Sequence, residues 1–77
     1  MWEWTVEYEG DTITVKNKIS KAILYLNGKE IDRQGGLTSA SLIGKTSAGK
    51  SIRAVINAGM IKIHVSIYVD DLKVFNN

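Results

Sequence analysis

The segment Ile61–Val69 alternates apolar and polar side chains with a period of two along its whole length. Isoleucine and valine occupy the odd positions, and Lys62, His64, Ser66 and Tyr68 occupy the even ones. Successive side chains of a β-strand point to opposite faces, so this pattern predicts a strand with one buried face and one mostly polar face. Another part of the chain must therefore cover its apolar side.

The rest of the chain also has strand character. The β-branched residues Ile, Val and Thr number 21 among the 77 residues, and such residues favour strands. Turn motifs such as Glu9-Gly10, Asn27-Gly28 and Asp70-Asp71 separate the apolar runs, and no segment has a helical period of useful length. We expect eight strands, at about residues 1–9, 11–17, 21–27, 29–33, 38–44, 50–57, 60–69 and 72–76.

The two halves of the chain are similar to each other. Gly10–Val15 is similar to Gly49–Ala54 at an offset of 39 residues, and Tyr25–Ile31 is similar to Tyr68–Val74 at an offset of 43. This predicts two four-stranded antiparallel meanders joined by a crossover at residues 34–36. Their apolar faces would meet about 10 Å apart in a small all-β sandwich. An internal duplication and a chance likeness of β-rich segments both account for the similarity.

Composition narrows the function classes. A chain of 77 residues forms a single domain, here residues 1–77. It has no cysteine and only one histidine, which excludes disulfide scaffolds, thiol nucleophiles and Cys- or His-rich metal sites. No apolar run is long enough to span a membrane, and the N-terminus lacks the features of a signal peptide. We therefore expect a cytoplasmic protein with no membrane partner, no metal and no cofactor.

The segment Gly44–Ser51 matches the phosphate-binding pattern G-x-x-x-x-G-K-[ST] letter for letter. In a nucleotide-binding loop of this kind a helix must follow, and its N-terminus helps to hold the phosphates. Here the residues that follow, Ile52–Asn57, have the composition of a strand. We therefore expect a hairpin loop with two lysines and no nucleotide site.

Two groups of residues are candidates for binding. The polar side of the last long strand predicts an interaction surface made of Met60, Lys62, His64 and Tyr68. The basic loop before the sixth strand predicts an anion contact made of Lys45, Lys50 and Arg53. No nucleophile–base pair, metal cluster or acid–base couple accompanies them, so no catalytic residue is assigned and an enzyme is not expected.

Three further features have structural interpretations. Trp2, Trp4 and Tyr8 share one strand face and are expected in the core, with a partner-facing aromatic patch as the alternative. Asp70 and Asp71 are expected to form a turn, because adjacent strand residues point to opposite faces and do not converge on a substrate. The lysines at 16, 18 and 21 are expected to guard an open sheet edge.

Four segments carry a resemblance to known proteins, at residues 25–29, 44–45, 50–57 and 67–73. Together they resemble the first domain of the Fas apoptosis inhibitory molecule family, and the chain also resembles small bacterial proteins of this layout. The resemblance implies an all-β, non-enzymatic sandwich module with no catalytic residue set. The second domain of the animal proteins has no counterpart here, so a role in cell death is not transferred.

These observations predict a protein-interaction or accessory module that binds another protein or a second copy of itself. Contact would be made through a sheet face or by strand addition at an open sheet edge. The net charge of +2 is small, so nucleic-acid binding is not expected. The alternative is a domain that binds a small ligand or a polyanion through the basic loop at residues 44–53.

Overall fold

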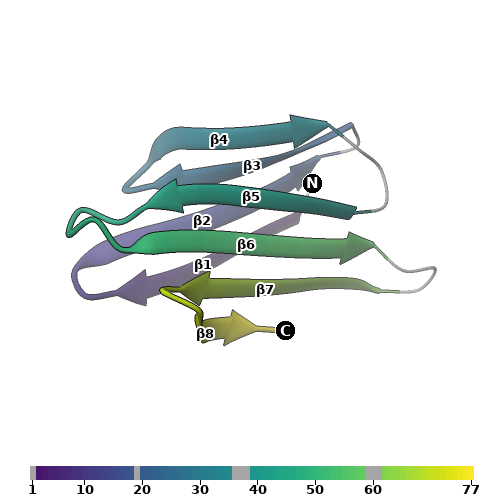
Figure 1. Cartoon of the computed structure of the whole chain (residues 1–77). Helices are drawn as coiled ribbons and strands as arrows, with labels where there is room; N and C mark the ends of the chain where they lie inside the picture. The colour runs from purple at the N-terminus through teal and green to yellow at the C-terminus, as the bar shows by residue number, and fades with distance from the viewer. Residues whose placement is uncertain (1, 19, 36–38, 59–61) are drawn as a thin grey trace.

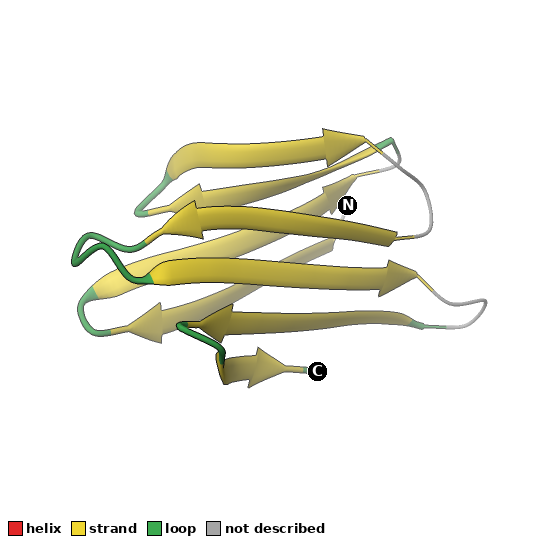
Figure 2. Ribbon diagram, in the orientation of Figure 1, coloured by secondary structure: helices red, strands yellow, loops and turns green. Residues whose placement is uncertain are grey.

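The computed structural model describes residues 2–18, 20–35, 39–58 and 62–77, and within them it confirms the predicted all-β fold. Eight antiparallel strands form two four-stranded sheets that lie face to face as two layers (Figure 1). Strands and short connections account for all of the described chain (Figure 2). The strands are β1 (Trp2–Tyr8), β2 (Asp11–Lys18), β3 (Lys21–Leu26), β4 (Lys29–Gly35), β5 (Ser39–Lys45), β6 (Ser51–Ala58), β7 (Ile63–Val69) and β8 (Leu72–Asn76).

Each sheet is a meander in which every strand pairs with its neighbour in sequence. The first sheet has the order β1-β2-β3-β4 and the second has the order β5-β6-β7-β8. The predicted strand bounds agree closely with those observed, except that β7 begins at Ile63 and not at residue 60. Residues 60 and 61, like residues 1 and 38 of other predicted strands, lie outside the described residues.

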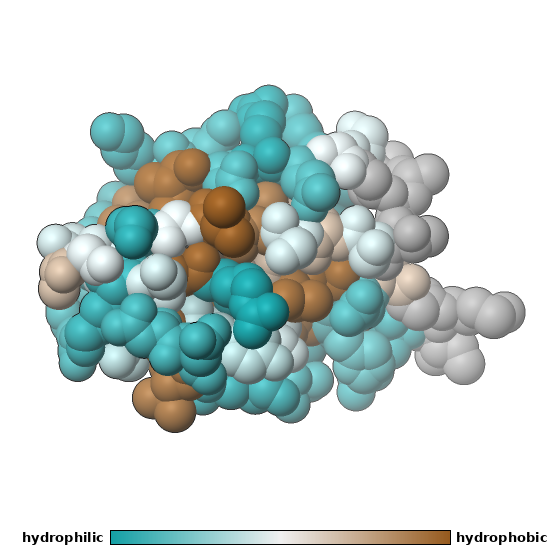
Figure 3. Space-filling view, in the orientation of Figure 1, coloured by the Kyte–Doolittle hydropathy of each residue, from teal (hydrophilic) through white to brown (hydrophobic). Residues whose placement is uncertain are grey.

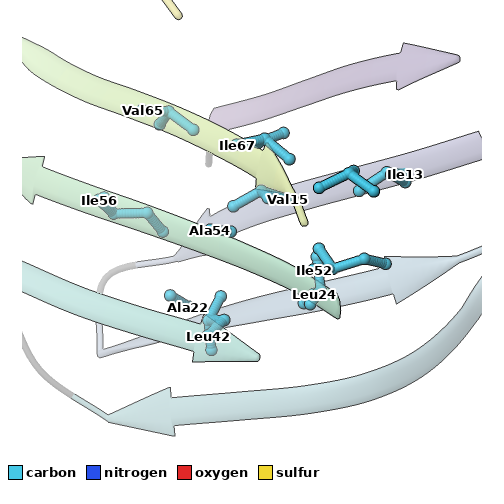
Figure 4. Close-up of a cluster of buried hydrophobic side chains, with 11 residues drawn as sticks. Ile13, Val15, Ala22, Leu24, Leu42, Ile52, Ala54, Ile56, Val65 and Ile67 are labelled. Atoms are coloured by element: carbon cyan, nitrogen blue, oxygen red, sulfur yellow. The ribbon is translucent and has the colours of Figure 1, made fainter. Parts of the chain in front are cut away.

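The core lies between the sheets and comes mostly from the central strands. Alternate side chains of β2, β6 and β7 point inward, as the period of two predicted, whereas β3 buries Ala22, Ile23 and Leu24 in succession. Figure 4 shows these aliphatic side chains meeting between the two layers. The buried cluster consists of Ile13, Val15, Ala22, Leu24, Leu42, Ile52, Ala54, Ile56, Val65, Ile67 and Val69.

The last hairpin of each half turns tightly through positive φ angles. Both central residues of the Asn27-Gly28 turn have positive φ, at 52° and 83°. The Asp70-Asp71 turn has φ of 49° and 66°, so it takes the same conformation without a glycine. Two positive φ values define the type I′ turn, whose twist matches that of the flanking strands.

The two halves repeat the same hydrogen bonds at these turns. Asn27 Oδ1 accepts the N–H of Thr12 at 2.8 Å, and Asn27 donates its own N–H to the carbonyl of Thr12 at 2.8 Å. Asp70 Oδ1 accepts the N–H of Ser51 at 2.9 Å, and Asp70 donates its N–H to the carbonyl of Ser51 at 2.8 Å. The last turn of each half is thus fastened to the start of that half's second strand.

A shift in strand register is repeated as well. It lies between Leu24 and Tyr25 in the β3–β4 ladder and between Ile67 and Tyr68 in the β7–β8 ladder. These positions correspond at the offset of 43 that the sequence similarity gave. The likeness of the two halves therefore extends from sequence to turn, hydrogen bond and bulge.

One side of the sandwich is closed by contacts between β4 and β5. Gln34 Oε1 accepts the N–H of Ser41 at 2.7 Å, and Asp32 Oδ2 accepts the N–H of Ile43 at 2.8 Å. A Cβ added to Gly44 would collide with the side chain of Ile31, so glycine permits this close approach. Side chains of one sheet thereby cover the edge of the other.

The expectation that lysines 16, 18 and 21 guard an open edge is wrong. Lys16 and Lys18 lie on β2, and Lys21 lies on β3. Both strands are central and pair with a neighbour on each side. The period of two places side chains on faces, but it does not tell which strands end a sheet, since that depends on the strand order.

Candidate functional site

Four outward side chains of the second sheet form a continuous row across its strands. Ile43 of β5 pairs with Arg53 of β6, Arg53 pairs with Tyr68 of β7, and Tyr68 pairs with Lys73 of β8. We call these four residues the Arg53–Tyr68 row. Directly opposed residues on neighbouring strands lie close enough for their side chains to interact.

Tyr68 lies between two cations within this row. The guanidinium carbon of Arg53 is 4.6 Å from the centre of the Tyr68 ring, and the ammonium of Lys73 is 5.7 Å from it. The negative face of an aromatic ring attracts cations at such distances. The ring therefore holds the two positive groups over one part of the sheet.

A shallow groove of about 460 Å³ opens beside the row. Ile43, Arg53 and Tyr68 line it together with Lys45, Ser51 and Asp71. Ile43 remains 65% exposed, although it is a large apolar residue. The space-filling view of this face shows apolar patches between hydrophilic side chains (Figure 3).

The charges of the groove are unbalanced. Among the described residues the ion pairs are Lys16–Glu3, Arg33–Glu30 and Lys50–Glu9, and none of them involves Lys45, Arg53 or Lys73. Asp71 is the only acidic residue that lines the groove within the described part of the chain. The site can therefore attract a group that carries negative charge.

The structure separates the three predicted anion contacts. Lys45 and Arg53 line the same groove. The ammonium of Lys50 instead lies 2.8 Å from Glu9 Oε1 and 5.4 Å from the centre of the Tyr8 ring, against the first sheet. The hydrogen bond to the Glu9 carboxylate is the main cause that raises the pKa of Lys50 above its ordinary value.

The residues of the predicted interaction surface lie in different places. Tyr68 belongs to the groove, whereas His64 is exposed further along β7, on the polar face that the alternation predicted. Lys62 lines a second, smaller groove with Trp2 and Trp4. Met60 lies outside the described residues.

Sequence reasoning missed Ile43 and Lys73 as members of the site. Lys73 follows directly from the Asp70-Asp71 turn, because a two-residue hairpin loop places residue 68 opposite residue 73. Ile43 requires the register between β5 and β6, which the sequence gives less clearly because the loop between them is longer.

The tryptophan strand is only partly buried. Trp4 and Tyr8 pack against the core, as expected, whereas Trp2 is 60% exposed, so the expectation of a core role is wrong for Trp2. Trp2 lies at the start of β1, where the strand reaches the smaller groove with Lys62 and Ile63. The predicted alternative of an aromatic patch that faces a partner remains a prediction.

The phosphate-loop-like string forms the hairpin between β5 and β6, and strand β6 follows it where a nucleotide site needs a helix. The N–H groups of Thr46, Ser47 and Lys50 in this loop are bonded within the protein. The N–H of Thr46 donates to the carbonyl of Lys50 at 2.8 Å, and the N–H of Lys50 donates to Thr46 Oγ1 at 3.0 Å. The N–H of Ser47 donates to Asp11 Oδ2 at 2.9 Å. The absence of a nucleotide site stays a prediction, which these bonds support.

Asp11 fastens this loop to the first sheet. Its carboxylate accepts the hydroxyl of Ser47 at 2.6 Å and the side-chain amide of Asn27 at 3.0 Å, in addition to the Ser47 N–H. These hydrogen bonds, that of the Ser47 hydroxyl first, hold the pKa of Asp11 below its ordinary value of 3.8. One ionised group thus joins three turns from both halves of the chain.

Comparison with protein-family models, with curated proteins and with solved structures found no match for this chain. The resemblance to the Fas apoptosis inhibitory molecule family therefore stays a prediction. Among the described residues no group of three His, Asp or Glu is placed to hold a metal ion. Those residues also include no helix that could cross a membrane.

Proposed function

We propose that this chain is a non-enzymatic protein-interaction module whose binding face is the outer surface of the second sheet. The observation that carries the proposal is the Arg53–Tyr68 row, in which an arginine without an acidic partner among the described residues stacks on a tyrosine. Arginine and tyrosine are enriched at the energetic centres of protein interfaces. The exposed Ile43 beside them adds an apolar contact.

The chemistry of the row indicates the chemistry of the partner. A guanidinium offers a planar fork of donors that a carboxylate accepts with two hydrogen bonds. Lys45, Arg53 and Lys73 lie at this face, and Asp71 is the only acidic residue among the described ones that lines its groove, so the charge around the face also favours an acidic partner. We expect a protein surface that presents a carboxylate next to an apolar side chain.

Affinity capture from cells that produce the protein tests this proposal with a matched pair of variants. Arg53→Glu reverses the charge of the row, and Arg33→Glu makes the same change in net charge on the outer face of the first sheet. We expect proteins that bind the wild type and Arg33→Glu but bind Arg53→Glu about 30-fold more weakly, since a central arginine contributes about 2 kcal/mol. Circular dichroism checks that both variants fold. Equal capture by all three proteins would contradict the proposal.

A second candidate is the binding of a small anion or polyanion in the same groove. Lys45 and Arg53 both line the groove, which favours this candidate. Binding of polyphosphate or heparin would weaken steeply as the salt concentration rises, because counterions compete for the cations. A protein contact that includes Ile43 would keep most of its affinity. Titration at two salt concentrations therefore distinguishes the two functions.

A further inference from the structure

Strand β1 ends the first sheet and pairs on one side only, with β2. Glu7 is paired with Thr12, and the backbone of Thr12 exchanges hydrogen bonds with Asn27 on the other side of β2. The Glu7–Thr12 pair therefore has no backbone hydrogen bonds between β1 and β2. In an antiparallel ladder such pairs alternate with hydrogen-bonded pairs. The backbone N–H and C=O groups of Glu3, Thr5 and Glu7 therefore point away from β2, toward the free edge.

This edge differs from the edge on the other side of the sandwich. There the N–H groups of Ser41 and Ile43 on β5 are bonded to side chains of β4. Outside the β1–β2 ladder, no hydrogen bond among the described residues reaches the backbone of Glu3, Thr5 or Glu7. A strand of seven residues whose outward backbone groups lack such bonds is long enough to template another strand.

The side chains of β1 define what kind of strand fits. Glu3 and Glu7 lie on the outer face and are exposed, with Glu3 3.9 Å from Lys16 and Glu7 accepting the hydroxyl of Thr12. On the inner face, Trp2 and Trp4 line the smaller groove, whose volume is about 220 Å³. A strand laid along β1 would thus meet negative charge on one face and aromatic surface on the other.

We propose that the β1 edge binds an extended segment of another protein in which basic and apolar residues alternate. The basic side chains lie opposite Glu3 and Glu7, and the apolar side chains between them pack toward Trp4. Pairing of β1 with β1 of a second copy is disfavoured, because antiparallel alignment about Thr5 places Glu3 opposite Glu7 and like charges repel. This surface is separate from the Arg53–Tyr68 row and does not depend on it.

Tryptophan fluorescence tests the proposal directly, because both tryptophans of the chain lie in β1. The probe is the synthetic peptide acetyl-Thr-Lys-Val-Thr-Val-Lys-Thr-amide. We expect a saturable blue shift of the emission, since the added strand buries the exposed ring of Trp2. An emission spectrum that stays unchanged up to millimolar peptide would overturn the proposal.

Two modified peptides separate strand addition from loose contact. N-methylation of the central threonine removes an N–H that would donate to β1 and should weaken binding about tenfold. N-methylation of the first valine removes an N–H that points away from β1 and should leave the affinity nearly unchanged. Equal effects of the two methyl groups would contradict pairing along the β1 edge.

A reciprocal exchange of charge tests the alignment. Glu7→Lys should weaken binding of the lysine peptide about tenfold, and replacing the first lysine of the peptide by glutamate should restore it. Arg53→Glu should leave peptide binding unchanged, so failure of this proposal and failure of the proposed function are told apart. Far-UV circular dichroism controls for folding. Loss of affinity without rescue would contradict the alignment.

Discussion

Two rows of outward side chains occupy the same place in the two sheets and carry different chemistry. In each row a tyrosine of the third strand stands between a residue of the second strand and one of the fourth. The row of the first sheet is Thr5, Thr14, Tyr25 and Glu30, and the row of the second sheet is Ile43, Arg53, Tyr68 and Lys73.

In the first row, the side chains of Thr5, Thr14 and Glu30 form hydrogen bonds within the protein. The hydroxyls of Thr5 and Thr14 are 3.2 Å apart, and Glu30 accepts two hydrogen bonds from Arg33 at 2.7 Å. The second row has cations where the first has Thr14 and Glu30. Turns and bulges therefore fix where the two rows lie. The side chains of each row determine whether its polar groups are bonded within the protein or remain available to a partner.

Truncation of core side chains should give the largest loss of stability. The loss should be similar in the two halves, because their cores are packed alike. Leu24 and Ile67 correspond at the offset of 43, and both are fully buried. Leu24→Ala and Ile67→Ala should each lower the free energy of unfolding by about 3 kcal/mol, measured by urea denaturation. That is a large part of the roughly 5 kcal/mol expected for a small domain. A large loss in one half alone would break the equivalence.

Replacement of Asp11 should give the second-largest effect on stability. Asp11 has no acidic counterpart in the second half, where Lys50 holds the corresponding position. Because the pKa of Asp11 is lowered in the folded protein, its contribution is fully present above about pH 4 and is lost as the pH falls through the folded-state value. In Asp11→Asn an amide N–H would meet the donors of Ser47 and Asn27, so the variant should be less stable at pH 7.

Thermal unfolding between pH 2 and 7 checks this expectation. The difference in melting temperature between wild type and Asp11→Asn should be largest at neutral pH and should shrink toward pH 2. A difference that stays constant over this range would show that the ionised carboxylate is not what holds the loop.

Substitutions at the second residue of the two type I′ turns should change the stability of the protein in opposite directions. Gly28 has φ of 83° and Asp71 has φ of 66°, a conformation that costs about 1 kcal/mol for a residue with a side chain. Gly28→Asp should therefore destabilise the protein by about 1 kcal/mol, and Asp71→Gly should stabilise it by up to about 1 kcal/mol. Chemical denaturation measures both. A destabilised Asp71→Gly would mean that the Asp71 side chain contributes more than its backbone costs.

Removal of charge from the two outer faces should give the smallest effect. Arg33→Gln breaks the pair with Glu30 and should lower the melting temperature slightly, less so at high salt. Arg53 has no such pair among the described residues and loses only its contact with the Tyr68 ring, so Arg53→Gln should lower the melting temperature less than Arg33→Gln does. Differential scanning calorimetry at two salt concentrations compares them. Equal decreases in melting temperature would show that Arg53 contributes as much to stability as Arg33 does.

Most of the fold could be predicted because the deciding interactions are local. Alternation over a few residues places Val65 and Ile67 inward and His64 outward. Turn residues such as Asn27-Gly28 set the pairing of the strands on either side. The strand order followed once every connection within a half was taken as a hairpin and residues 34–36 as the crossover between the halves.

Individual residues of the site were predicted, but their proximity was not, because it depends on the registers between strands. Arg53 and Tyr68 were each singled out, but they were assigned to different surfaces. A slip of one residue between β6 and β7 would have placed them on opposite faces, and the connection between these strands does not fix the register. Lys50 could not be placed from the sequence, since its contact with Glu9 depends on how the two sheets dock.

The meander order has a consequence for the speed of folding. Every ladder joins strands that follow each other in the chain, so strand pairing closes only short loops and costs little loop entropy. Proteins with such local contacts fold faster than β-sandwiches whose partners are distant in sequence. Among the interactions described above, the packing between the sheets, the bonds of Asp11 to Ser47 and the pair of Lys50 with Glu9 must wait for remote parts of the chain to meet.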